Sequence, residues 1–136
     1  MKVTSNWQEG FKSVIDNGRD HNVTVDLPYL QHGKDEGPTS LELAVMGYAG
    51  CVTTIFKMMA EKLKVDVSAM RCVVNTEYGD KTIEKAEVIL ELSSQASPKL
   101  IKKAYQLTQE HCPVGVLFEN SGVDVEYKIN IQGSEI

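Results

Sequence analysis

The sequence has little cysteine and no segment that would direct the chain out of the cell. Its 136 residues include only three cysteines, an odd number at wide spacing that does not fit the disulfide framework of a secreted protein. The first residues lack the apolar stretch of a secretory signal. Because cytosolic thiols are normally kept reduced, we expect a cytoplasmic protein in which any disulfide is transient and chemical.

Clusters of basic residues are also missing. The 14 lysines and arginines are dispersed, and together with 19 acidic residues they give a net charge of −5. Nucleic-acid-binding proteins carry a basic face, and anionic membrane surfaces attract basic segments, so neither partner is expected. With 42% hydrophobic and 24% charged residues, the composition is that of an ordinary globular chain. The length favours a single domain over residues 1–136.

One long uncharged stretch is present, and it begins with a helix start signal. Thr39 and Glu42 fit the Ser/Thr-x-x-Glu capping box, and the fourteen residues from Leu43 to Phe56 carry no charge. This stretch is shorter than the ~20 residues that span a bilayer, so it predicts a buried helix, roughly Thr39 to Leu63. A helix that is apolar on all sides needs cover on all sides. We therefore expect a second copy of the chain on its far face.

Alternating apolar residues predict β-strands on both sides of this helix. The first strands meet at Asn17-Gly18, a pair that suits a two-residue hairpin. Two more strands follow the helix and turn at Gly79-Asp80, and a last strand runs from Val123 to Ile131. With further helical segments before that last strand, the order predicts an α+β fold with largely antiparallel sheets packed on the long helix.

The second helix is predicted to begin at Ser97-Pro98, with serine as its N-cap and proline in the first position. It ends at Cys112, because Pro113 disfavours the helical conformation in the residue before it. Pro113 also suits the first position of a further short helix, which makes Cys112 the N-cap of that helix. Backbone N–H groups and the helix dipole stabilise a thiolate there, so a lowered thiol pKa is expected for Cys112.

The three cysteines differ in their surroundings. Cys72 lies on the apolar face of its strand, where a cysteine is usually a small buried hydrophobe. Cys51 lies within the uncharged helix, and both a core position and a reactive thiol fit it. The neighbouring glycines at 47 and 50 favour the reactive thiol, because they leave space over the helix surface at a cost in helix stability. Cys51 and Cys112 together form a candidate dithiol that only the fold can assemble.

The stretch TSLELAVMGYAGC, followed about sixty residues later by CPVG, resembles the OsmC/Ohr family of thiol-dependent hydroperoxide reductases. GRDH at residues 18–21 also looks like the N-terminal strand of that family. The resemblance implies an OsmC-like fold, an intertwined homodimer with two sites at the subunit interface, and no cofactor. It also implies that Cys51 attacks the peroxide, that Cys112 resolves the product as a disulfide, and that an external dithiol restores both thiols.

The resemblance further implies a catalytic arginine. Arg19 matches its position in one branch of the family, and its parity with Val23 along the strand points it inward; a solvated turn residue is the other interpretation. In many members a glutamate holds this arginine, but Leu41 stands at the matching position here. Glu42 follows, turned by about 100° around the helix. It either takes over that task or serves only in the capping box.

Two functions remain open from the sequence. The first is a peroxidase for organic hydroperoxides, in which a sulfenic acid forms and is converted to a disulfide. The apolar neighbours of the helix cysteine favour a substrate with an alkyl tail: Met46, Val52, Ile55 and Phe56. The second, supported by Leu41, is a non-catalytic protein that binds a small apolar ligand at the dimer interface. Metal binding by the cysteines with His111 and His32 is not favoured, because their spacing does not suit a ligand set.

Overall fold

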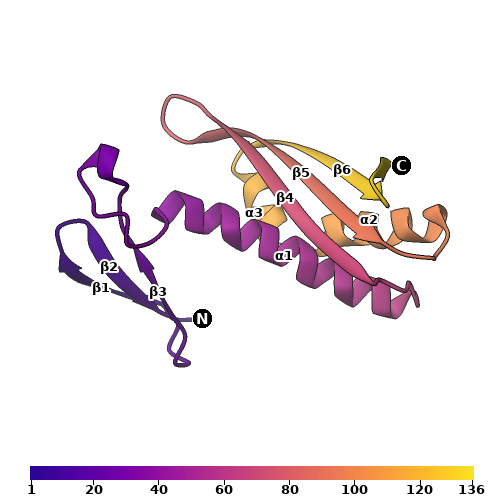
Figure 1. The fold of residues 1–136 in the computed structure, drawn as a ribbon, viewed down its shortest axis with the longest axis horizontal. Helices are drawn as coiled ribbons and strands as arrows, with labels where there is room; N and C mark the ends of the chain where they lie inside the picture. The colour runs from indigo at the N-terminus through magenta and orange to yellow at the C-terminus, as the bar shows by residue number, and fades with distance from the viewer. The chain divides into compact units, whose positions relative to one another are not determined.

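The computed structural model describes residues 1–136, which divide into two compact units, residues 1–46 and 47–136 (Figure 1). The N-terminal unit contains a three-stranded antiparallel sheet in the order β1-β2-β3. A loop with one 3₁₀ turn, η1, follows the sheet and leads to the start of helix α1 (Ser40–Lys62). The bounds are β1 Thr4–Glu9, β2 Lys12–Asp16, β3 Asn22–Val25 and η1 Tyr29–Gln31.

The connection between β2 and β3 is longer than the sequence pattern predicts. Asp16 pairs with Asn22, so residues 17–21 all lie between the strands, and the expectation of a two-residue hairpin is wrong. The side chains of Asp16 and Asn17 each accept a hydrogen bond from the backbone N–H two residues later, at 2.5 and 2.9 Å. Aspartate and asparagine stabilise such local turns with their own side chains, which here opens the hairpin into a wider loop.

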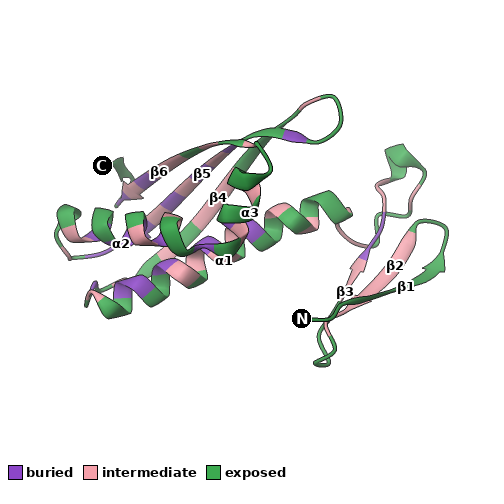
Figure 2. Cartoon of the chain, turned by 180° about the vertical axis from the view of Figure 1, so that it is seen from behind, coloured by how far each residue is buried: buried purple, intermediate pink, exposed green.

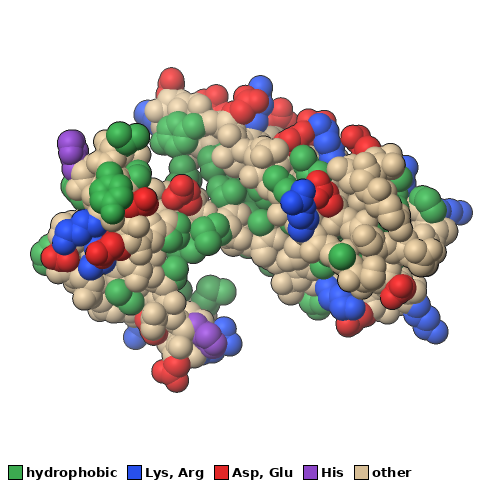
Figure 3. Space-filling model, in the orientation of Figure 1, with side chains coloured by type: hydrophobic (Ala, Val, Ile, Leu, Met, Phe, Trp, Pro, Cys, Tyr) green, Lys and Arg blue, Asp and Glu red, His purple; other side chains and the backbone are tan.

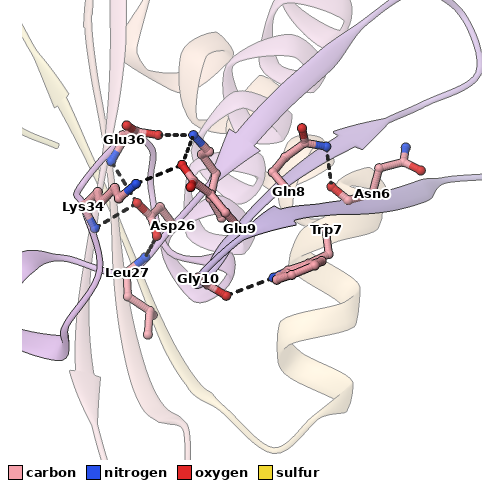
Figure 4. A network of polar contacts seen from close by, with 10 residues as sticks. Asn6, Trp7, Gln8, Glu9, Gly10, Asp26, Leu27, Lys34 and Glu36 are labelled. Carbon is pink, nitrogen blue, oxygen red and sulfur yellow. Dashed lines mark hydrogen bonds and ion pairs between the residues drawn. The ribbon is translucent and has the colours of Figure 1, made fainter.

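The loop after β3 is organised around the buried carboxylate of Asp26 (Figure 4). Its oxygens accept hydrogen bonds from the backbone N–H groups of Leu27 (2.8 Å), Lys34 (3.0 Å) and Glu36 (3.3 Å). Burial alone would raise the pKa of Asp26, but these three hydrogen bonds lower it overall. A Cβ added at Gly33 would lie 1.8 Å from the carbonyl oxygen of Leu27. The loop therefore depends on a glycine at this close approach.

Helix α1, Ser40–Lys62, matches the predicted span closely. The capping box is confirmed, because the Glu42 carboxylate accepts from the Thr39 N–H (2.7 Å) and the Thr39 hydroxyl accepts from the Glu42 N–H (3.2 Å). An eighteen-residue window of the helix has a mean hydropathy of 1.4. By length and composition alone the helix is therefore long and apolar enough to cross a membrane, a test that core helices of soluble proteins also pass. The apolar part of the helix is longer than the uncharged run from Leu43 to Phe56.

The C-terminal unit has a four-stranded sheet in the order β4-β5-β6-β7, with helices packed on one face (Figures 1 and 2). Strands β4 and β5 form the predicted antiparallel pair, whereas β5 and β6 are parallel. Parallel neighbours need a long crossover connection, and the helical segments supply it. The fold is α+β with largely antiparallel sheets, as predicted. The bounds are β4 Ala69–Tyr78, β5 Ile83–Ser93, α2 Pro98–His111, α3 Pro113–Asn120, β6 Asp124–Ile131 and β7 Ser134–Glu135.

One hydrophobic core joins the helices to this sheet, and α1 contributes one face to it (Figure 2). Burying a large apolar side chain stabilises a fold by about 1.5–3 kcal/mol, so this face of α1 is a main source of stability. Met58, on another side of the helix, is 47% exposed, so α1 is not buried all round within one copy. The central core residues are Tyr48, Val52 and Phe56 of α1, Val88 and Leu90 of β5, and Ile101 and Ala104 of α2.

Charged side chains of both signs are interspersed on the surface seen in Figure 3. Several pair across neighbouring strands of the C-terminal sheet, including Lys85 with Glu77 and Lys128 with Glu87. Exposed pairs of this kind contribute little to stability. The dispersed charges of the sequence thus remain dispersed on this face.

Candidate active site

The fold brings Cys51 and Cys112 together. Cys51 lies in the middle of α1, Cys112 lies between α2 and α3, and both are free thiols. The thiol of Cys112 donates a hydrogen bond to Cys51 Sγ, and the two sulfur atoms are 3.0 Å apart. A Cβ added at Gly47 or Gly50 would meet no other atom within 4 Å, so the helix surface beside Cys51 is open, as predicted. Since a disulfide needs about 2.05 Å, the sulfurs must approach by only about 1 Å.

Cys112 is the N-cap of α3, also as predicted. Its backbone is extended, with φ −76° and ψ 105°, and its sulfur accepts a hydrogen bond from the N–H of Gly115 at 3.4 Å. Its own N–H donates to the carbonyl of Thr108 at 2.8 Å and so closes the end of α2. The side chain is only 2% exposed. Cys112 therefore has a fixed place at the junction of two helices.

The expectation of a lowered thiol pKa at this N-cap is wrong. Burial, assisted by the hydrogen bond with Cys51, raises the pKa of Cys112 to about 12, although the N–H of Gly115 acts in the opposite direction. Desolvation disfavours a thiolate more strongly here than one short helix stabilises it. Cys112 therefore keeps its proton at neutral pH. It presents that proton to the sulfur of Cys51, where the hydrogen bond stabilises negative charge.

Two tyrosines that the sequence did not identify adjoin the cysteine pair. The hydroxyl of Tyr48 on α1 is 2.7 Å from that of Tyr127 on β6, and Tyr127 donates to Glu119 Oε1 at 2.8 Å. Burial raises the pKa of Tyr48 to about 12, so this hydroxyl stays protonated. Tyr48 precedes Cys51 by three residues, which places both on the same side of a helix and could have identified it. No sequence signal points to Tyr127.

The other predicted site residues lie in the N-terminal unit. Arg19 is exposed in the bend between β2 and β3. The next residue, Asp20, has a positive φ of 61°. The in–out alternation of side chains along β3 therefore does not extend back to Arg19, and the predicted inward direction of Arg19 is wrong. Glu42 is engaged in the capping box, and Leu41 is 38% exposed. Catalytic roles for Arg19 and Glu42 stay predictions.

The apolar residues near Cys51 in the sequence do not share one face. Val52 and Phe56 are buried in the core, whereas Met46 is 56% exposed. Two grooves of the C-terminal unit, of about 250 and 470 Å³, lie against the sheet and include neither cysteine. No group of three or more His, Cys, Asp or Glu side chains is placed to hold a metal ion.

Cys72 makes no hydrogen bond with either thiol of this pair. It faces the core from β4, in register with Leu90 of β5, and is partly buried. Burial raises the pKa of Cys72 to about 11, which leaves almost no thiolate at neutral pH. Its surroundings are those of the structural cysteine that the sequence predicts.

We expect the substitution Cys72→Ala to leave intact the hydroperoxide turnover that the family resemblance implies. It should lower the free energy of unfolding by on the order of 1 kcal/mol, because one partly buried packing contact is lost. Denaturant unfolding and a turnover assay on the same preparation measure both effects. A Cys72→Ala protein that folds but has lost turnover would show that the reactive pair includes Cys72.

A family model for the OsmC-like protein matches residues 33–128, which include both cysteines of the pair. The OsmC-like protein of Mycoplasma pneumoniae has the same fold, with 15% identity, a TM-score of 0.85 and coverage of 96% of this chain and 95% of that chain. An organic hydroperoxide resistance protein OsmC from Legionella pneumophila follows with 15% identity, a TM-score of 0.66 and 96% of each chain. The organic hydroperoxide resistance protein OhrB of Bacillus subtilis has 18% identity, a TM-score of 0.63 and coverage of 96% of each chain. No curated protein matches the chain in sequence.

Proposed function

The chain belongs to the OsmC-like family, and we propose that it is a thiol-dependent peroxidase that reduces organic hydroperoxides. The observation that carries the proposal is the 3.0 Å separation between the sulfurs of Cys51 and Cys112. Two thiols at this distance suit a sulfenic acid followed by a disulfide. Two proteins of the same fold, from Legionella pneumophila and Bacillus subtilis, are named for resistance to organic hydroperoxides, which supports the same chemistry.

In the first step, the thiolate of Cys51 attacks the terminal oxygen of the hydroperoxide. A sulfur–oxygen bond forms as the oxygen–oxygen bond breaks, so the sulfur is oxidised to a sulfenic acid and the peroxide is reduced. The alkoxide leaves and takes up a proton to become the alcohol. The hydrogen bond from Cys112 stabilises the attacking thiolate. We assign to Arg19 and Glu42 the supporting positive charge and its anchor, as the family resemblance implies.

In the second step, the sulfur of Cys112 attacks the sulfenic sulfur of Cys51. A disulfide bond forms, the sulfur–oxygen bond breaks, and hydroxide leaves with the proton of Cys112 as water. Because burial raises the pKa of Cys112 to about 12, this proton is best lost to the departing hydroxide within the same step. An external dithiol then transfers two electrons and two protons and restores both thiols. We place this cycle in the cytoplasm, where such reductants are maintained.

A homodimer is part of this proposal. In the middle of α1 the exposed residues Gly50, Thr54 and Met58 form an uncharged line, and the exposed charges Lys57 and Glu61 lie toward the end of the helix. This uncharged line suits a packed surface better than solvent. The family resemblance implies a second copy at the site, and that copy would supply the apolar wall that an alkyl tail needs. We expect sedimentation to show a dimer at micromolar concentration. A stable folded monomer under these conditions would contradict it.

A non-catalytic protein that binds a small apolar ligand at the dimer interface is the second candidate. Two observations favour it: Leu41 replaces the glutamate found in many members, and neither sulfur of the pair has a cationic hydrogen-bond partner in the structure. Without positive charge nearby, a thiolate forms less readily.

Turnover with a reductant separates the two candidates. A catalytic amount of the protein, supplied with excess dithiothreitol, is expected to consume many equivalents of cumene hydroperoxide per chain. It should consume hydrogen peroxide more slowly, because an alkyl tail gains free energy in an apolar pocket. Consumption no faster than in a control without protein, with the thiols unchanged, would reject the peroxidase and leave the binding protein.

A further inference from the structure

Three hydrogen-bonded side chains beside the cysteine pair have no part in the steps above. Tyr48 comes from α1, Tyr127 from β6 and Glu119 from α3, so the group ties three elements together. A tyrosine hydroxyl has one proton to donate. Since the Tyr127 hydroxyl donates its one hydrogen bond to Glu119, its oxygen must accept a hydrogen bond from the Tyr48 hydroxyl. The order of donation, from Tyr48 through Tyr127 to Glu119, is therefore fixed.

The same side chains hold one face of α3. Gly115, Phe118 and Glu119 follow one another at the spacing that places residues on one side of a helix. The ring of Phe118 packs on Tyr48 with centroids 4.7 Å apart. A Cβ added at Gly115 would lie 3.3 Å from the Tyr48 hydroxyl and 3.4 Å from the Tyr127 hydroxyl. The two hydroxyls thus lie directly against the glycine, and α3 is fastened along this face.

This face begins at the turn that holds Cys112. The N–H of Gly115 donates to the sulfur of Cys112 at 3.4 Å, and Cys112 caps the helix that Glu119 nearly ends. A displacement of α3 away from Tyr48 and Tyr127 would carry the sulfur of Cys112 with it. The 3.0 Å approach to Cys51 therefore depends on the position of α3.

We propose that Tyr48, Tyr127 and Glu119 are positioning residues that hold Cys112 within reach of Cys51 for disulfide formation. Holding two reacting groups in place raises their effective concentration, and a helix fastened at its far end limits the motion of its N-cap. In the disulfide step only the side chain of Cys112 needs to move, by about 1 Å, while α3 stays in place. The biological meaning rests on the proposed peroxidase, but the geometry concerns the dithiol alone.

The test uses thiol–disulfide exchange without peroxide. The reduced protein is equilibrated with mixtures of reduced and oxidised dithiothreitol, and the fraction of Cys51–Cys112 disulfide is measured. Tyr127→Phe removes one hydroxyl and is expected to lower the equilibrium constant for the disulfide on the order of tenfold, the effect of one or two lost hydrogen bonds. Tyr105→Phe is the matched control. Tyr105 is buried and Tyr127 is partly buried. The ring of Tyr105 packs edge-on against that of Tyr127, but its hydroxyl donates to Val88 O at 3.2 Å and takes no part in the group's hydrogen bonds.

Substitutions at Glu119 keep the test independent of folding, because this side chain is exposed. Glu119→Ala should weaken the disulfide, whereas Glu119→Gln, which retains an acceptor oxygen, should restore most of its stability. With cumene hydroperoxide, Tyr127→Phe should convert the sulfenic acid of Cys51 to the disulfide about tenfold more slowly. Formation of the sulfenic acid should slow less, because it depends on Cys112 only through one hydrogen bond. A general structural defect would slow both steps to the same extent.

Two results would overturn the inference. One is a disulfide equilibrium in Tyr127→Phe and Glu119→Ala equal to that of the unmodified protein. The other is an equal loss in Tyr105→Phe and Tyr127→Phe, which would show only the cost of deleting a buried hydroxyl. If the unmodified protein forms the disulfide with dithiothreitol but does not react with peroxide, the proposed peroxidase fails and the exchange equilibria still decide the role of the tyrosines.

Discussion

Replacement of Cys51 by serine is expected to abolish consumption of organic hydroperoxide, with a loss on the order of 10³-fold or more, as when other enzymes lose their nucleophile. The reason is chemical rather than structural. Cys51 is the acceptor of the hydrogen bond from Cys112, so it is the sulfur on which negative charge is stabilised. A serine hydroxyl is far less readily ionised than a thiol, and it forms no sulfenic acid.

Cys72→Ala is the control for this substitution, because it removes a thiol from the same unit without touching the pair. Peptide mapping by mass spectrometry after exposure to peroxide should find no oxygen on any cysteine of Cys51→Ser. If Cys112 instead gains oxygen at a normal rate in Cys51→Ser, the roles of the two thiols are reversed. In the intact protein, burial and the hydrogen bond to Cys51 raise the pKa of Cys112, which argues against Cys112 as the attacking thiol.

Replacement of Cys112 by serine should have a different result: one rapid reaction and then inactivation. The sulfenic acid of Cys51 still forms, but no second thiol is present at 3.0 Å to convert it to a disulfide. Excess peroxide then oxidises it to the sulfinic and sulfonic acids. Serine is a favourable N-cap residue, so the start of α3 should persist and the fold should be retained.

Mass spectrometry distinguishes these states of Cys51 by the number of oxygens added. Cys112→Ser should add one oxygen to Cys51 with one equivalent of peroxide, and two or three with an excess. The unmodified protein at the same excess should show the Cys51–Cys112 cross-link instead. Absence of any added oxygen at Cys51 in Cys112→Ser would contradict the assignment of Cys51 as the residue that attacks the peroxide.

The strongest local signals in the sequence predicted the structure well. The capping box at Thr39 and the uncharged run located α1, and alternating residues located β4, β5 and β6. Pro113 fixed the break at Cys112 through a steric effect on one neighbouring residue. These features depend on residues close together in the chain, which is why a sequence reveals them.

What could not be predicted depends on contacts between distant residues. The N-cap position of Cys112 suggested a lowered thiol pKa, but its burial by the rest of the core reverses the direction. Tyr127 lies on a strand whose pattern shows only that it faces inward, and its hydrogen bonds to α1 and α3 follow from the parallel pairing of β5 and β6. The inward direction of Arg19 failed because a residue with positive φ separates it from β3.

The pairing of Cys51 with Cys112 is an intermediate case. No local pattern connects two residues that lie so far apart in the chain. Their surroundings suggested a dithiol, and the resemblance to a family implied the role of each thiol. The structure then supplies the distance, 3.0 Å between the sulfurs, and the neighbouring groups that could hold it there.

Titration of free thiols before and after one equivalent of cumene hydroperoxide tests the two-cysteine peroxidase most directly. The chain has three free thiols, at Cys51, Cys72 and Cys112. One equivalent of peroxide accepts two electrons, so two thiols per chain should disappear and peptide mapping should join Cys51 to Cys112, with Cys72 still free. Three thiols remaining after the peroxide has been added, or a cross-link that includes Cys72, would contradict the mechanism.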